Sequence, residues 1–255
     1  MIAYLGMYDR PETAAANDQL WSAIRKNLEQ GPETLNRNID PWTAWQSPNL
    51  MLAQTCGCPF RTRLYGEVEL IGTPDYGLPD CAPGFYRSVF VVKKSEAQPR
   101  LEQFDRASFA YNDALSQSGW AAPLIHMQDL GILPGELIET GGHQASAQAV
   151  AEGHADFAAL DMLSWALILE HDDFASDLTV IERTVATPGL PFITSLKQDP
   201  AQLFIAVKSA IEALDTESRE ALHLKGFLHI PTSDYLAVPT PPGPVLTGLK
   251  IKART

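Results

Sequence analysis

Predicted strands alternate with predicted helices along most of this 255-residue chain, and that alternation restricts the fold more than any other feature. Short apolar runs such as 50–54 and 157–160 have the length of buried strands, and polar turns and helical apolar spacing follow them. Strand–helix alternation is typical of mainly parallel sheets covered by helices. The sequence therefore predicts an α/β fold. The tail from residue 231 is rich in Pro and Gly, and we expect it to be irregular.

Two extended runs interrupt the series of strand–helix units, near residues 86–92 and 178–184. We interpret them as crossovers between two lobes, because each lobe of 100–150 residues can bury its own core. The predicted division gives a discontinuous lobe 1, residues 1–87 and 184–255, and an inserted lobe 2, residues 88–183. We expect the strands at 109–111, 137–139 and 157–160 to share lobe 2.

The composition of the chain argues against some classes of binding partner. The formal charge of -12 argues against nucleic acid or an anionic membrane as the main partner. No apolar run approaches the roughly 18 residues that a membrane span needs. The first ten residues lack the basic region and long apolar core of a signal peptide, which leaves a cytoplasmic location open.

The stretch from Phe109 to Gly119 predicts a strand end, a polar turn and a helix start. Asn112 is a turn former, and Ser116 is a good helix N-cap. Ser116, Gln117, Ser118 and Gly119 therefore gather at a helix N-terminus, which carries partial positive charge and unpaired N–H groups. Capture of an oxyanion is one interpretation. An ordinary capped helix is the more common alternative.

Two further polar residues follow predicted strands of the same lobe. His143 comes after Gly141-Gly142 and before a helix, so it could donate to an oxyanion, cap the helix or face solvent. Asp161 opens a helix after a buried strand, where a carboxylate either binds a ligand or caps the helix. Because ligands of open α/β sheets sit beyond the carboxyl ends of strands, we expect such residues to converge on one cleft.

Lobe 1 supplies its own candidates at strand ends. Tyr8 could wall the cleft, and Thr55 and Gly57 could donate from a loop, although a half-buried core tyrosine and a simple turn are the alternatives. We expect Cys56 and Cys81 to lie close enough to bridge, and Cys58 to stay free and face the cleft. Three reduced thiols are the alternative.

Taken together, these residues resemble the phosphate, phosphite and phosphonate substrate-binding family of ABC importers, a branch of the type II periplasmic binding proteins. The resemblance covers most of the chain. It rests on residues 7–11, 54–59, 72–74, 86–88, 112–119, 141–146 and 149–161, and above all on their order and spacing.

The resemblance implies two α/β lobes with a central cleft and two extended crossovers, no bond broken, and no metal or cofactor. A small phosphorus oxyanion would be held in the interlobe cleft and delivered to an ABC permease, and lobe closure would signal occupancy. The family's location would be periplasmic. The implied ligand-binding residues are Tyr8, Thr55, Gly57, Asn112, Ser116, Gln117, Ser118, Gly119, His143 and Asp161.

The sequence departs from the family at one position and leaves two other functions open. Similar proteins often have Cys-Gly-Tyr-Pro where Cys58 replaces the tyrosine here, so one aromatic wall is missing. An enzyme on the same fold is one alternative, although Ser118 and His143 lack an evident third group to orient them. A cytosolic sensor or carrier of a small phosphorylated or thiamine-precursor-like ligand is the other.

Overall fold

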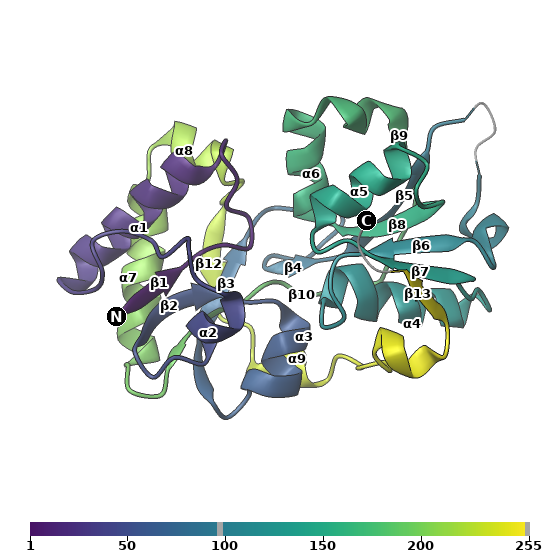
Figure 1. Cartoon of the computed structure of the whole chain (residues 1–255). Coiled ribbons are helices and arrows are strands. Elements are labelled where there is room, and N and C mark those ends of the chain that lie inside the picture. Colours follow the sequence, from purple (N-terminus) through teal and green to yellow (C-terminus); the bar gives the residue numbers. More distant parts are fainter. Residues whose placement is uncertain (96–98, 253–255) are drawn as a thin grey trace. The chain divides into compact units, whose positions relative to one another are not determined.

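The computed structural model describes residues 1–95 and 99–252 and divides them into two compact units. Unit 1 comprises Met1–Phe85 and Pro188–Val238, and unit 2 comprises Tyr86–Thr187 and the described residues from Pro239 onward. The short strands β4 (Phe85–Tyr86) and β10 (Thr187–Pro188), where the chain passes between units, pair with each other (Figure 1). Both units are α/β, as the alternation of strands and helices predicts.

The sheet of unit 1 has the order β1-β2-β11-β3-β12. β1 and β2 are parallel, whereas β11 runs antiparallel to β2 and β3, and β12 runs antiparallel to β3. Its strands are β1 (Ile2–Tyr4), β2 (Leu50–Gln54), β3 (Val68–Asp75), β11 (Phe192–Ser195) and β12 (Gly226–Leu228). Its helices are α1 (Ala14–Leu28), α2 (Pro41–Trp45), α3 (Gly57–Pro59), η1 (Phe60–Leu64), α7 (Pro200–Ala213), α8 (Thr216–Ala221) and α9 (Thr232–Leu236).

Helix α1 shows why the apolar pattern of unit 1 folds as it does. Leu20, Trp21, Ile24 and Leu28 recur at helical spacing, and all four are buried in a core that also contains α7. The helix begins at Ala14, but its N-cap Thr13 makes no capping bond to the helix. The Thr13 hydroxyl instead donates to the carbonyl of Tyr8 (2.8 Å), and this bond fixes the loop after β1.

The sheet of unit 2 has the order β13-β7-β6-β8-β5-β9. Its first four strands are parallel, and β5 runs antiparallel to β8 and β9. The strands are β5 (Ser88–Lys93), β6 (Ser108–Tyr111), β7 (Glu136–Glu139), β8 (Phe157–Asp161), β9 (Leu178–Arg183) and β13 (Lys250–Lys252). The helices are η2 (Leu101–Phe104), η3 (Gln117–Ala121), α4 (Ala122–Asp129), α5 (His143–Ala151), α6 (Met162–His171), η4 (Asp173–Asp177) and η5 (Pro244–Thr247).

Two layers of helices cover this second sheet. Helices α5 and α6 lie over one face and α4 over the other (Figure 1). On the α4 side, Trp120 and Met127 pack against Phe90, Phe109 and Phe157 from three strands. Strands β6, β7 and β8 lie in this one sheet, as predicted for 109–111, 137–139 and 157–160. The extended runs near 86–92 and 178–184, which we expected to cross between lobes, instead form β5 and β9 of the same sheet, and the chain changes units at Phe85/Tyr86 and Thr187/Pro188.

The C-terminal segment differs from expectation in two ways. Residues 239–252 belong to unit 2, whereas we expected all of 184–255 to return to lobe 1. Strand β13 also forms where we expected an irregular tail, because it adds in parallel to the open edge of β7. The Nζ of Lys250 lies 3.0 Å from Glu136 Oε1, and Lys252 pairs with the other oxygen of that carboxylate. Tertiary pairing thus overrides the low local propensity of this Pro-rich and Gly-rich segment.

We predict that Ile24→Ala lowers the free energy of unfolding by about 2–5 kcal/mol, because the isoleucine is fully buried between α1 and α7. The control is Ile205→Ala on α7, where the side chain is 66% exposed and a change within about 0.5 kcal/mol is expected. Urea denaturation followed by circular dichroism measures both. Equal losses in the two variants would contradict the packing described for α1.

Candidate functional site

The candidate site of unit 2 is built where β6 and β7 end side by side. The amide of Thr140 donates to the carbonyl of Tyr111 (2.9 Å), and the amide of Gly141 donates to that of Asn112 (2.9 Å). These bonds continue the parallel pairing of the two strands beyond their last residues. The turn after β6 and the turn after β7 are therefore held together at one edge of the sheet.

The turn after β6 leads into a helix start that Ser116 caps. The Oγ of Ser116 accepts from the amide of Gly119 (2.9 Å), and the amide of Ala121 donates to the Ser116 carbonyl (2.9 Å). The second bond spans five residues, so the helix opens with a wide π-type turn, η3, before α4 continues it. The capping interpretation of Ser116 is confirmed. Gln117, Ser118 and Gly119 follow the cap and are buried.

His143 begins the second helix at this edge and meets the first. It follows Gly141, which has φ 84°, and Gly142, and it is the first residue of α5. Its Nε2 lies 3.0 Å from the Oγ of Ser118. The starts of η3 and α5 are thus joined by one hydrogen bond between the two side chains that we expected to bind an oxyanion.

Backbone amides accompany these side chains. The first intrahelical bond at the start of α5 runs from the amide of Ser146 to the carbonyl of Gly142 (2.9 Å). The N–H groups of residues 143–145 precede it, so they have no acceptor within the helix. The hydroxyl of Ser146 lies 2.6 Å from that of Thr140, which ties α5 to the end of β7. Sequence reasoning missed this supporting pair, although both hydroxyls stand in the Gly-rich segment that it singled out.

Gly119 is required by the close approach of Asn112. A Cβ on Gly119 would lie 1.8 Å from the Asn112 Oδ1 and 3.3 Å from the His143 Cε1. The Oδ1 of Asn112 is buried there without a hydrogen-bond partner. Asn112, Gly119 and His143 therefore lie close together at this helix start.

Burial keeps the His143 ring neutral. Both ring nitrogens are enclosed, since Nε2 meets Ser118 and Nδ1 has almost no accessible area, although the residue as a whole is partly exposed. Burial lowers the pKa of His143 to about 4, and the backbone of Ala159 on β8 opposes that shift by favouring the protonated ring. The imidazole is therefore uncharged at neutral pH in the absence of ligand.

Asp161 is an N-cap in this structure. Its Oδ1 accepts from the amides of Leu163 (2.8 Å) and Ser164 (3.0 Å), and the residue is buried at the end of β8. In the register of β5 and β8, Asp161 stands opposite Ser88, whose hydroxyl is buried without a partner. At least one of the two carboxylate oxygens of Asp161 therefore caps helix α6, as the capping alternative predicts.

The candidates of unit 1 lie at the ends of its own strands. Tyr8 packs edge-to-face against Tyr76, with ring centroids 5.3 Å apart. The side-chain Nε2 of Gln54 donates to the Tyr76 hydroxyl (2.9 Å). Thr55 is fully buried, and its hydroxyl makes no hydrogen bond. Gly57 has only loose neighbours around its missing Cβ, so packing does not demand a glycine there.

Tyr76 is the aromatic residue that sequence reasoning missed. It follows the Gly72-Thr73-Pro74 segment, and its position two residues past the end of that recognised motif was the only available signal. Similar proteins often have a tyrosine where this chain has Cys58. Tyr76 nevertheless places an aromatic side chain beside Tyr8. Cys56, Cys58 and Cys81 form no disulfide in this structure, so the expected bridge between Cys56 and Cys81 is not formed. Cys58 is buried.

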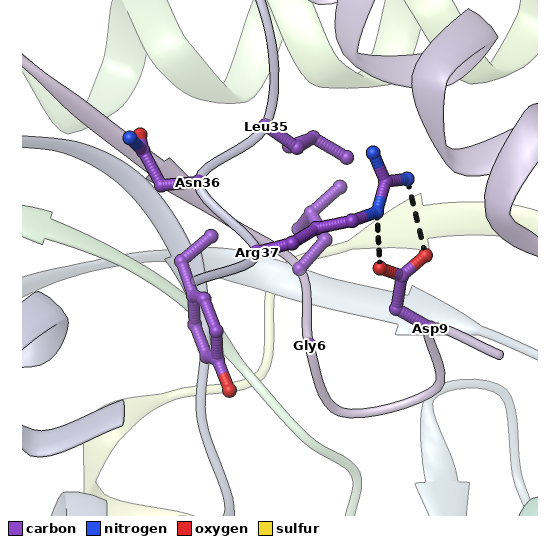
Figure 2. Close-up of a pocket in the computed structure, with 7 residues that line it drawn as sticks. Gly6, Asp9, Leu35, Asn36 and Arg37 are labelled. Carbon is purple, nitrogen blue, oxygen red and sulfur yellow. Dashed lines mark hydrogen bonds and ion pairs between the residues drawn. The ribbon is translucent and has the colours of Figure 1, made fainter. Parts of the chain in front are cut away.

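The pocket around Arg37 in unit 1 is not an anion site. It has a volume of about 150 Å³ and is lined by Tyr4, Leu5, Gly6, Asp9, Leu35, Asn36 and Arg37 (Figure 2). Arg37 is bidentate on Asp9, with Nε 2.6 Å from Oδ2, and its Nη1 lies 2.7 Å from Asp18. Hydrogen bonds to these two carboxylates raise the pKa of Arg37. Two acids thus neutralise the guanidinium, which leaves no net positive charge to attract an anion.

Two negative findings apply to residues 1–95 and 99–252. Their His, Cys, Asp and Glu residues form no group of three or more that could hold a metal ion. None of their helices is both long enough and apolar enough to cross a membrane.

Residues 60–235 match the family model of the periplasmic substrate-binding proteins of phosphonate ABC transporters. The chain belongs to this family. It is a family of substrate-binding proteins. No curated protein sequence matches the chain.

Solved structures show the same fold at low sequence identity. A binding protein component of an ABC phosphonate transporter from Pseudomonas aeruginosa is 16% identical, with a TM-score of 0.72 over 92% of this chain and 82% of that one. PhnD1 from Prochlorococcus marinus, solved with methylphosphonate, is 17% identical, with a TM-score of 0.66 over 92% and 94%. MatC from Rhodopseudomonas palustris, solved with malate, is 13% identical, with a TM-score of 0.61 over 91% of both. The phosphonate-binding family member described here therefore has the two-lobed type II fold.

We predict that Gly119→Ala destabilises this phosphonate-binding family member, because the new methyl group would overlap the Asn112 side chain. A loss of about 1–3 kcal/mol is expected from urea denaturation. The double variant Asn112→Ala/Gly119→Ala should recover most of the loss. The matched control is Gly226→Ala, where a Cβ meets open space at an ordinary backbone angle. Equal effects at the two glycines would contradict the close approach at Gly119.

The buried His143 also predicts a pH dependence of stability. Its folded-state pKa lies below its ordinary value of 6.5, so the unfolded chain binds the proton more readily. Without ligand, the stability contributed by neutral His143 is complete above about pH 6.5 and is lost as the pH falls toward about 4. Urea denaturation of His143→Gln at pH 5 and 7.5 should show a smaller pH effect than wild type. His154→Gln, which alters an exposed histidine, should retain the wild-type effect.

Proposed function

We propose that this family member captures a small phosphorus oxyanion, such as phosphate, phosphite or a phosphonate, for import by an ABC permease. The observation that carries the proposal is the contact between Ser118 and His143, which joins two helix starts at one sheet edge. Two N-terminal helix ends direct partial positive charge and free N–H groups toward the same place. A tetrahedral anion can be held there without an arginine or lysine.

The remaining candidates of unit 2 support the same ligand class. Ser116 fixes the backbone of the helix start, and Gly119 leaves room for Asn112 beside the His143 ring. We further propose that Gln117, Asn112 and Asp161 contribute from this unit, and that Tyr8, Thr55 and Gly57 contribute from unit 1. The fully buried Thr55 hydroxyl has no hydrogen-bond partner in the protein, which suits a role toward a ligand.

The family membership favours capture and delivery over turnover. Capture and release of a ligand needs hydrogen bonds but no activated nucleophile. No carboxylate is described that orients the His143 ring of the Ser118–His143 pair. The permease as partner and a periplasmic location come from the family and are part of the proposal.

We predict that Ser118→Ala and His143→Ala each weaken methylphosphonate binding about 10- to 150-fold. A hydrogen bond to a charged group contributes roughly 1.5–3 kcal/mol, which corresponds to that range. Isothermal titration calorimetry at pH 7 measures the affinities. Ser176→Ala, which changes an exposed serine of the same unit, is the control and should bind as wild type. Wild-type affinity in both site variants would leave the two helix starts as ordinary capped helices.

A further inference from the structure

Ser88 carries a buried hydroxyl at the same sheet edge as the candidate site. It begins β5 and stands opposite Asp161, the last residue of β8, in their antiparallel register. Because β8 runs parallel to β6, the end of β8 and the beginning of β5 lie at the edge where the turn after β6 starts. Ser88 therefore belongs to the edge that carries Ser118 and His143.

The side chain of Ser88 lies on the face of the sheet that η3 and α4 cover. Side chains two residues apart along a strand share a face, and Phe90 and Val92 follow Ser88 at that spacing. Both pack in the core that contains Trp120 of η3, and η3 also packs on β8, the neighbour of β5. The hydroxyl is thus on the side of the sheet from which the helix start after β6 approaches.

The backbone groups of Ser88 are paired, whereas its hydroxyl is not. Its amide donates to Thr184 Oγ1 (2.9 Å), and its carbonyl accepts from the amide of Thr184 (3.0 Å). The residue is 1% exposed, and its Oγ has no hydrogen-bond partner in the protein. Such a buried hydroxyl costs folding free energy, so native proteins keep few of them without a partner.

Other hydroxyls at this edge are satisfied by the protein itself. Those of Ser116, Ser118 and Thr140 each have a hydrogen-bond partner. The hydroxyl of Ser88 therefore awaits a group from outside the chain, which is either an ordered water or a bound ligand. Its place beside the helix start that carries Ser118 favours the ligand.

We propose that Ser88 is a further ligand-binding residue of unit 2, and that its hydroxyl donates to an oxygen of the captured oxyanion. This inference rests on the proposed function. A serine hydroxyl has one hydrogen to donate, and no acceptor of the protein takes it here. Ser118 and His143 hold the anion from the helix starts after β6 and β7, and Ser88 holds it from the strand beyond β8. A phosphorus oxyanion has several oxygens, so donors on different strands can each meet one.

Ser88→Ala tests the proposal by two measurements. In calorimetry at neutral pH, its affinity for methylphosphonate should fall about 10- to 150-fold, as expected for the loss of a hydrogen bond to a charged group. In urea denaturation without ligand, it should unfold at the same urea concentration as wild type or at a higher one, because the substitution removes an unpaired buried hydroxyl. A hydroxyl with a merely structural role would lower the unfolding midpoint and leave the affinity unchanged.

Ser195→Ala is the matched control. Ser195 ends β11 in unit 1, is 4% exposed, and its Oγ also has no hydrogen-bond partner. Because β11 runs antiparallel to β2, Ser195 lies toward the edge of the sheet at which β2 begins, away from the strand end that leads to Thr55. This variant should bind methylphosphonate as wild type does, and its unfolding midpoint should not fall.

The outcomes separate this inference from the function on which it rests. Wild-type affinity in Ser88→Ala, or equal losses of affinity in Ser88→Ala and Ser195→Ala, would overturn the role of Ser88. A lower unfolding midpoint of Ser88→Ala without ligand would also overturn it, because the hydroxyl would then be paired within the protein. Weaker binding by Ser118→Ala would in each case leave oxyanion capture intact. A wild-type protein that binds none of phosphate, phosphite and methylphosphonate would overturn the proposed function itself.

Discussion

Parallel pairing of β6 with its neighbours β7 and β8 is the constraint on which the rest of unit 2 depends. Parallel strands end at the same edge of a sheet, so the turns that follow them are neighbours even where the sequence separates them by 25 residues or more. The backbone bonds from Thr140 and Gly141 extend the ladder into those turns. Two helix starts consequently face each other, and Ser118 can reach His143.

The cores on the two faces of the sheet hold this edge in place. On one face, Phe109 and Phe157 pack with Trp120 at the start of the helix that carries Ser118. On the other face, α5 packs on β8 and β5. Because each helix is attached by its apolar side, its N-terminal turn is held at the sheet edge by packing that involves no ligand. The candidate site is thus held in place by the fold itself, which lowers the free-energy cost of ordering it if a ligand binds there.

The neutral His143 ring lies where the helices η3 and α5 begin. Burial favours the uncharged ring, and helix-end dipoles supply positive potential beside it. This arrangement differs from the Arg37 pocket of unit 1, where a permanent cation is matched by Asp9 and Asp18.

The sequence by itself determined the α/β class, the strands of unit 2, the apolar face of α1, the cap at Ser116 and the pair Ser118 and His143 as candidates. These features depend on local periodicity and turn chemistry, which a short window of residues expresses. Three features were decided only by the tertiary structure: the addition of β13 to β7, the capping role of Asp161 and the contact of Tyr76 with Tyr8. The strand pairing and the tyrosine contact depend on residues that are distant in sequence. The role of Asp161 depends on a choice between capping a helix and binding a ligand, and aspartate can do either. Only the packed chain, which fixes which strand edge is open and which backbone amides lack a partner, makes that choice.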